Sequence, residues 1–222
     1  MGQWTPMEGD YAALRNGLDA RDLVRSINEI VLPALEAALP PIDSAQITFD
    51  PEQFHVPQTV LATMRESLVI ALGSTFEKAF RSWLYDCAFH ADGEQGNRAI
   101  RAEPWDSLKR RFASVRGFDF ADLPGARDLD CLVLLGNALR HGAGKSVARL
   151  FQEFPQFFAD DPPGSMAYFV ETDPELLDFH LKIITADLDR LGRAAVDFWD
   201  FVAERGEDVV WFRGADTRAR NG

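Results

Sequence analysis

Residues 57–90 place the strongest constraint on how this chain can fold. Apolar side chains recur there at spacings of three and four, which puts them along one side of a helix. Pro57 suits a first helical turn, where its missing N–H has no intrahelical partner. The stripe holds for about seven turns and consists of Val60, Leu61, Met64, Leu68, Leu72, Phe76, Phe80, Trp83, Leu84 and Cys87. The pattern predicts a long helix with one buried face, which other helices must cover.

The remaining sequence has the same periodicity almost throughout. We therefore predict an all-α protein, a helical bundle of about five to six helices, two of them long. Besides the helix from Pro57, helices are expected at residues 10–39 (bent before Pro33), 105–116, 127–141, 145–158 and from Asp173 to about Val202. Short extended pieces are expected at residues 46–49 and 168–170. We predict a single helical domain over 1–222, with an N-terminal helix and connection at 1–56, a core at 57–205 and a mobile charged tail at 213–222.

Composition fits a protein with a large core. Hydrophobic residues make up 46% of the 222 positions, and no apolar run reaches the roughly 18 residues that cross a bilayer. The segment Met1–Pro6 lacks the charged and then apolar pattern of a secretory signal. We expect a cytoplasmic protein that does not bind membranes. Cys87 and Cys131 lie within apolar helical patterns, which favours buried thiols over a disulfide or a nucleophile.

The charge of the chain is unevenly distributed. A net charge of −12 argues against a general nucleic-acid binder, since phosphate affinity comes from Lys and Arg. Residues 98–149 nevertheless hold ten Lys and Arg against six Asp and Glu, whereas the rest holds thirteen against twenty-nine. The relatively basic part surrounds His141. Ordinary scatter of solvated charge explains the imbalance equally well.

The segment from Gly136 to Gly142, Gly-Asn-Ala-Leu-Arg-His-Gly, follows an apolar run at 132–135. Asn137 and His141 are four residues apart, so on a helix they share one face. Gly142 supplies a C-cap. An imidazole titrates near neutral pH and suits acid–base chemistry. Alternatively, a protonated His141 only stabilises the helix end.

This ending, after a long helix that carries Glu77, resembles the HEPN superfamily, many of whose members have Arg-Asn-x-x-x-His-Gly there. The resemblance covers the layout of residues 57–205 and the motif at 137–142. It implies a homodimer that acts as a metal-independent endoribonuclease, with two copies of the motif forming one cleft. The motif His then activates a ribose 2′-hydroxyl or protonates the leaving oxygen, and the motif Arg stabilises charge on the phosphate.

The sequence departs from the motif at Gly136, where the family has Arg. Arg140 precedes His141, but successive helical residues are about 100° apart, so we expect it to replace that cation only if the helix has unwound there. The resemblance implies His141 and Asn137 as catalytic residues, and its Arg role carries over to no residue of this chain. Arg140, Lys145 and Glu77 flank these two and are expected as substrate-binding residues. Two functions remain. One is a degenerate, weakened endoribonuclease; the other is a non-catalytic HEPN-like scaffold that binds RNA, a nucleotide or a protein partner.

Three other patterns are weaker indications of function. The segment Gly142–Ser146 ends like a P-loop but has Leu139 where that loop needs Gly, and no strand is expected before it. Lys145 and the helix amides beside it could still hold an anion. No metal or cofactor is expected, because the four histidines, His55, His90, His141 and His180, lack ligand spacing.

The third pattern is a basic cluster at residues 109–111, with Arg98, Arg101 and Arg116 nearby. Its cations could contact phosphates, and the interleaved Trp105 and Phe112 could stack on bases. The alternative, which we favour, is that these aromatic rings face the core while the charges face water.

Overall fold

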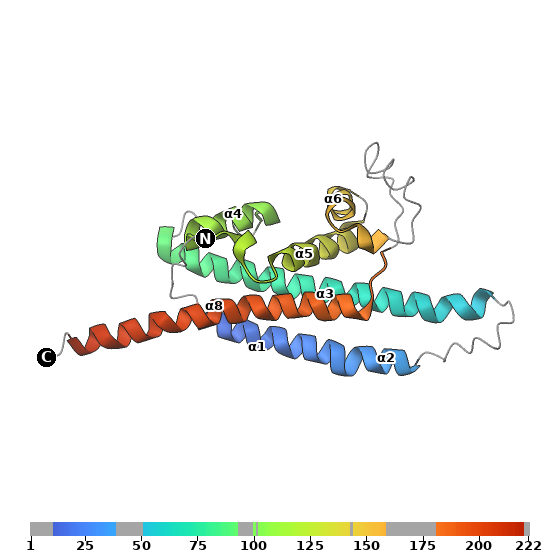
Figure 1. Ribbon diagram of the computed structural model, residues 1–222, viewed down its shortest axis with the longest axis horizontal. Helices are drawn as coiled ribbons and strands as arrows, with labels where there is room; N and C mark the ends of the chain where they lie inside the picture. Colours follow the sequence, from blue (N-terminus) through green and yellow to red (C-terminus); the bar gives the residue numbers. More distant parts are fainter. Residues whose placement is uncertain are drawn as a thin grey trace. The chain divides into compact units, whose positions relative to one another are not determined.

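The computed structural model describes residues 11–38, 51–92, 100, 102–142, 144–158 and 181–219. Within these ranges every regular element is helical, and the longest are α3 and α8 (Figure 1). The predicted all-α helical bundle with two long helices is confirmed. The extended pieces expected at residues 46–49 and 168–170 lie outside the described residues.

The first helix contains a widened turn before Pro33. The α-helix α1 (Tyr11–Arg25) continues into the π-helical η2 (Ser26–Val31) and then α2 (Leu32–Ala38). Proline has no N–H to donate, and its ring clashes with the carbonyl one turn back in a regular α-helix. A π-turn at this point removes that conflict, while the bend expected before Pro33 stays a prediction.

The long helix α3 (Pro51–Asp92) begins earlier than predicted. Pro51 follows an aspartate and precedes a glutamate in the sequence, and all three residue types favour a helix start. This signal outweighs the one at Pro57. The next helix, α4 (Trp105–Arg116), has the predicted bounds and ends at Gly117, whose φ of 64° is left-handed.

The 3-10 turn η5 (Phe120–Asp122) leads into α5 (Ala126–His141), which carries the motif. Gly142 ends α5 with φ 72°, and its N–H donates to the carbonyl of Ala138 at 2.9 Å. This confirms the C-cap expected there. The helix predicted over 145–158 consists of α6 (Lys145–Glu153) and the 3-10 turn η6 (Pro155–Phe158), because Pro155 cannot donate to continue an α-helix.

The last helix, α8 (Thr185–Ala219), does not extend back to Asp173 through residues 181–184 as predicted. The N–H of Lys182 donates to the carbonyl of Phe157 at 2.8 Å. The carboxylate of Asp187 accepts from the N–H of Ile184 at 3.1 Å, as in a capping box that starts a helix. At the other end α8 continues through Ala219, where the sequence predicted a tail from residue 213.

The chain forms two compact units, and α1, α3, α5 and α8 each contribute to both. The first unit comprises Met1–Asp22, Ser74–Asp130 and Gly192–Gly222, and the second comprises Leu23–Gly73 and Cys131–Leu191. The single domain over 1–222 with a core at 57–205 stays a prediction.

The core of the first unit is a cluster of aromatic rings from α3, α4, η5 and α8. Its closest pairs are Phe198 with Trp199, at 4.8 Å between ring centroids, and Phe80 with Trp105 at 5.2 Å, both edge-to-face. Such pairs add to the free energy gained from burial alone. The buried members are Phe76, Phe80, Trp83, Trp105, Phe112, Phe120, Phe198 and Trp199.

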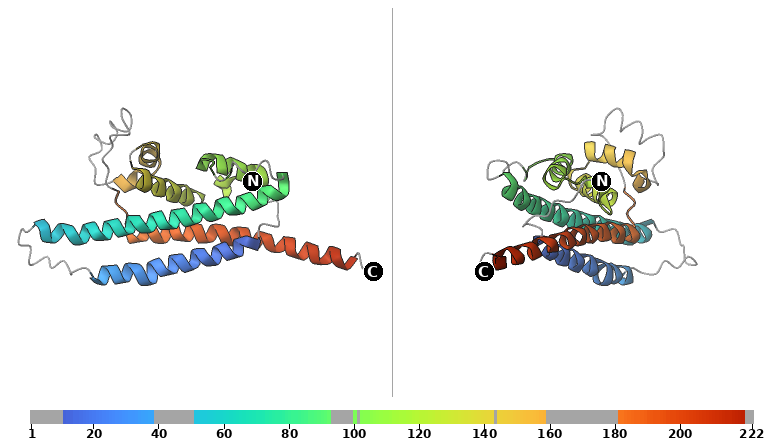
Figure 2. Two further views of the ribbon diagram at one scale, coloured as in Figure 1. Left: turned by 180° about the vertical axis from the view of Figure 1, so that it is seen from behind. Right: turned by 60° about the vertical axis from the view of Figure 1, so that its left-hand side comes forward.

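In the second unit α3 approaches α5 closely. A Cβ added at Gly73 would lie 3.3 Å from the carbonyl oxygen of Leu132. Polar contacts join α2, α3 and α8, which lie side by side in Figure 2. Arg65 donates to Thr185 at 3.2 Å, and the Thr185 hydroxyl donates to Glu36 at 3.1 Å.

Candidate functional site

The motif residues lie where α5 leaves the packed interior of the second unit. Residues 131–136 and Ala138 are all buried, so this stretch anchors the helix. Asn137 is half-buried and His141, on the last turn, is exposed. The apolar run before the motif therefore fixes α5 and presents the imidazole to solvent.

Arg140 folds back along α5 toward Gly136. Its Nε donates to the carbonyl of Gly136 at 3.0 Å, and its Nη2 donates to Oδ1 of Asn137 at 2.9 Å. A Cβ built at Gly136 would lie 3.7 Å from that Nη2. Because α5 stays helical through His141, the unwinding at Arg140 considered from the sequence does not occur, and the Arg140 side chain reaches back along the helix.

Lys145 is exposed at the first position of α6. Gly144 precedes it with φ 140° and gives α6 no side-chain cap. Cations at the end of α5 are favoured by the helix dipole, and the start of α6 presents backbone N–H groups. Because α5 occupies the position of the strand that a P-loop needs, a nucleotide P-loop is excluded here.

Glu77 belongs to the first unit, whereas Asn137, Arg140, His141 and Lys145 belong to the second. Its carboxylate accepts from Nη2 and Nε of Arg81 at 2.5 and 3.1 Å. Arg81 also donates to the carbonyls of Ile100 and Glu103, at 2.9 and 2.8 Å. Glu77 therefore helps Arg81 hold the chain before α4.

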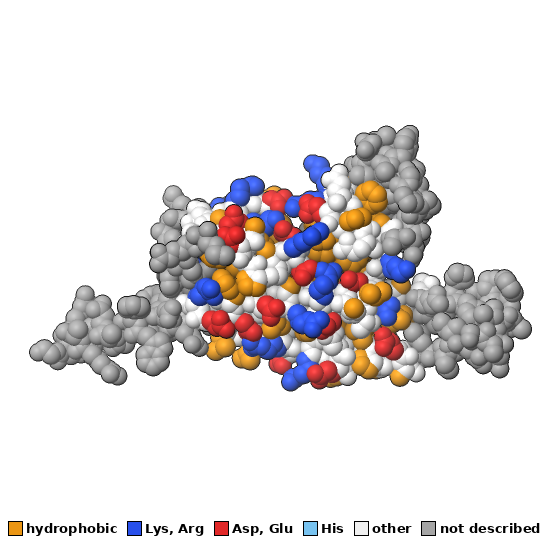
Figure 3. All heavy atoms as spheres, viewed as in Figure 1, with side chains coloured by type: hydrophobic (Ala, Val, Ile, Leu, Met, Phe, Trp, Pro, Cys, Tyr) orange, Lys and Arg blue, Asp and Glu red, His pale blue; other side chains and the backbone are white. Residues whose placement is uncertain are grey.

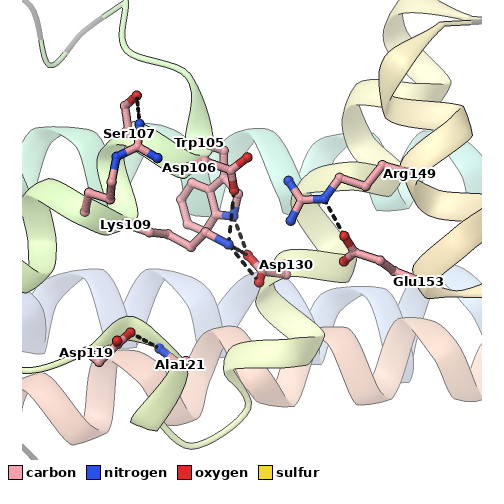
Figure 4. Close-up of polar contacts among 10 residues, drawn as sticks. Trp105, Asp106, Ser107, Lys109, Asp119, Ala121, Asp130, Arg149 and Glu153 are labelled. Atoms are coloured by element: carbon pink, nitrogen blue, oxygen red, sulfur yellow. Dashed lines mark hydrogen bonds and ion pairs between the residues drawn. The ribbon is translucent and has the colours of Figure 1, made fainter.

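The basic cluster at 109–111 is engaged within the fold. Asp130 accepts from Lys109 at 2.8 Å and from the indole of Trp105 at 2.6 Å (Figure 4). Arg111 forms an ion pair with Glu103. Trp105 and Phe112 lie in the aromatic core, which confirms the favoured interpretation of these rings. Figure 3 likewise shows basic side chains beside acidic ones on the face that it draws. Arg98 and Arg101 lie outside the described residues.

Arg116 is the residue that the sequence analysis placed least well. It is fully buried, its guanidinium lies 4.5 Å from the ring centroid of Trp83, and its Nη2 donates to Sγ of Cys87 at 3.0 Å. A signal was available, because position 116 continues the buried 105–108–112 face of α4 at helical spacing. Cys87 and Cys131 are buried and form no disulfide, as predicted.

Within the described ranges no three His, Cys, Asp or Glu side chains group as metal ligands. His180 and the side chains of His55 and His90 lie outside what the structure describes. None of the described helices has a window long and apolar enough to span a membrane.

Comparisons with protein-family models, with curated proteins and with solved structures find no match to this chain. The HEPN relationship therefore depends on the motif and the helical layout and stays a prediction.

Proposed function

We propose that the end of α5 is an RNA-directed site of the HEPN kind and that the chain is a weakened, metal-independent endoribonuclease. The observation that carries the proposal is an exposed imidazole, His141, on the turn where the guanidinium of Arg140 covers Gly136. In this assignment His141 is the general acid or base, and Lys145 binds phosphate. Glu77 is left out, because its carboxylate is engaged by Arg81.

The proposed reaction is an internal transesterification. The ribose 2′-oxygen forms a bond to phosphorus while the bond to the 5′-oxygen breaks, leaving a 2′,3′-cyclic phosphate and a 5′-hydroxyl. His141 takes the proton of the 2′-hydroxyl or, in its protonated form, supplies one to the leaving oxygen. The charge that builds on the phosphate oxygens needs a fixed cation. The resemblance adds a homodimer, in which each subunit contributes one imidazole to a shared cleft.

The second candidate is the non-catalytic scaffold, which binds RNA, a nucleotide or a protein partner. It is favoured by the missing side chain at position 136, since losing one electrostatic stabiliser lowers rates by about 10²–10³. In this alternative Lys145 retains RNA but no bond is cut.

Both candidate functions are tested by incubating the purified protein with labelled single-stranded RNA in EDTA. The endoribonuclease predicts 2′,3′-cyclic phosphate ends that disappear in His141→Ala and persist in Arg15→Ala, which removes an exposed cation from α1. Saturable RNA binding without cleavage, weakened by Lys145→Ala, supports the scaffold instead. If the protein neither cleaves nor binds RNA, the proposed RNA-directed site is overturned.

A further inference from the structure

We propose that Arg140 is the phosphate-binding cation of this site, supplied from one helical turn beyond the position where the motif cation is missing, and that Asn137 is its positioning residue. This inference depends on the proposed function, namely that the end of α5 receives RNA. It assigns the electrostatic role that Gly136 leaves vacant.

The register of α5 makes this relocation possible. Gly136 and Arg140 are four residues apart and therefore lie on one face of the helix. Helical side chains lean toward the N-terminus, so a long side chain at 140 extends back over position 136. The Nε of Arg140 lies 3.0 Å from the carbonyl oxygen of Gly136, and its Nη2 lies 3.7 Å from where a Cβ at 136 would be. The guanidinium thus lies in contact distance of the point where a side chain at position 136 would begin.

The absence of a side chain at 136 is part of the same arrangement. A Cβ there would just touch the guanidinium, and any longer side chain would compete for the volume that the guanidinium occupies. A second arginine at 136 would also bring two like charges together at i and i+4, which is unfavourable on a helix. Glycine at 136 and arginine at 140 are therefore complementary.

Asn137 fixes the orientation of the guanidinium. Its Oδ1 accepts from Nη2 at 2.9 Å, while the carbonyl of Gly136 accepts from Nε. The guanidinium is a planar fork that recognises phosphate through paired N–H groups, so its orientation decides how well it binds. Asn137 touches Arg140 and acts through it, which makes it a positioning residue.

The test measures RNA binding against salt in EDTA, by fluorescence anisotropy of a labelled single-stranded oligonucleotide between about 50 and 200 mM salt. Each phosphate contact adds about −0.7 to the slope of log K against log salt for single strands. We expect Arg140→Ala to weaken binding and make the slope less negative by about that amount. The double variant Gly136→Arg/Arg140→Ala should restore the RNA affinity and the salt slope, whereas Gly136→Ala/Arg140→Ala should restore neither. Arg15→Ala, the matched control, keeps the wild-type slope.

Asn137→Ala keeps the charge, so we expect the salt slope to stay near that of the wild type while the rate of any cleavage at saturating RNA falls. The inference is overturned if Arg140→Ala binds RNA with unchanged affinity and slope, or if the Gly136→Arg double variant binds no better than its Gly136→Ala counterpart. If His141→Ala loses cleavage while Arg140→Ala binds and cleaves RNA as the wild type does, the proposed function stands and only the phosphate-binding role of Arg140 is removed. A wild-type protein that binds no RNA would remove both.

Discussion

Two helical glycines of the second unit should respond differently to the same substitution. Alanine in place of a glycine inside a helix gains about 1 kcal/mol of intrinsic helix propensity. At Gly136 the new Cβ would lie 3.7 Å from Nη2 of Arg140, which is ordinary van der Waals contact. At Gly73 it would lie 3.3 Å from the backbone oxygen of Leu132, which is tighter than an ordinary contact and requires the two helices to shift by a few tenths of an ångström.

The helix-propensity gain and the overpacking cost together set the change in unfolding free energy of each variant. Gly136→Ala should keep most of its propensity gain, about 0.5–1 kcal/mol, and raise Tm by about 1–4 °C for a chain of this size. Gly73→Ala gains the same propensity but adds an overpacking cost of about 1–3 kcal/mol. We expect the two variants to differ by about 1–3 kcal/mol in unfolding free energy, in favour of Gly136→Ala.

Urea unfolding followed by far-UV circular dichroism measures this difference from the two midpoints, provided that the denaturant slopes agree. The guanidinium of Arg140 should keep its place in Gly136→Ala, so that variant should also bind RNA as the wild type does. If Gly73→Ala proves as stable as Gly136→Ala, the tight approach of α3 to α5 is refuted.

Four other predictions address the fold and assembly. Asp130→Ala leaves two donors without their carboxylate and should cost about 2–3 kcal/mol in urea unfolding, whereas Asp106→Ala, an exposed partner of the same lysine, should cost under about 0.5 kcal/mol; equal losses would contradict the structural role of the half-buried Asp130. Phe80→Ala should lower stability by about 3–5 kcal/mol, and a loss below about 1 would refute the aromatic core. Gly142→Ala forces φ 72° on an alanine and should cost about 1–2 kcal/mol; an unchanged melting temperature would count against that cap. Light scattering should give about twice the chain mass of 24.8 kDa, and a monomer would contradict the predicted dimer.

Much of the fold could be predicted from local signals. The bounds of α4 and the end of α5 follow from apolar spacing and from glycines that adopt left-handed conformations after the last turn. The start of α8 could not be read this way, because Asp187 caps it in a segment where Asp173 and Pro174 gave a stronger apparent start. Short 3-10 and π segments such as η2 are set by proline geometry and by packing, which periodicity does not report.

Part of the candidate site could likewise be predicted from the sequence, and part could not. The exposure of His141 and the cap at Gly142 were within reach of the sequence, because both depend on the position of the helix end. The path of the Arg140 side chain follows from its position four residues after Gly136, on the same helix face, and not from its adjacency to His141 in the sequence. Arg116 was missed because charge alone suggested the surface, whereas its register placed it against Trp83.

The most direct measurement is an NMR titration of the imidazole signals with single-stranded RNA, in which His141→Ala identifies the resonance of His141 among the four histidines. An imidazole presented to RNA should shift progressively and saturate at the same RNA concentration as binding measured by anisotropy, whether or not the RNA is cut. Saturation of the protein with RNA while the His141 resonance stays unmoved would contradict the account.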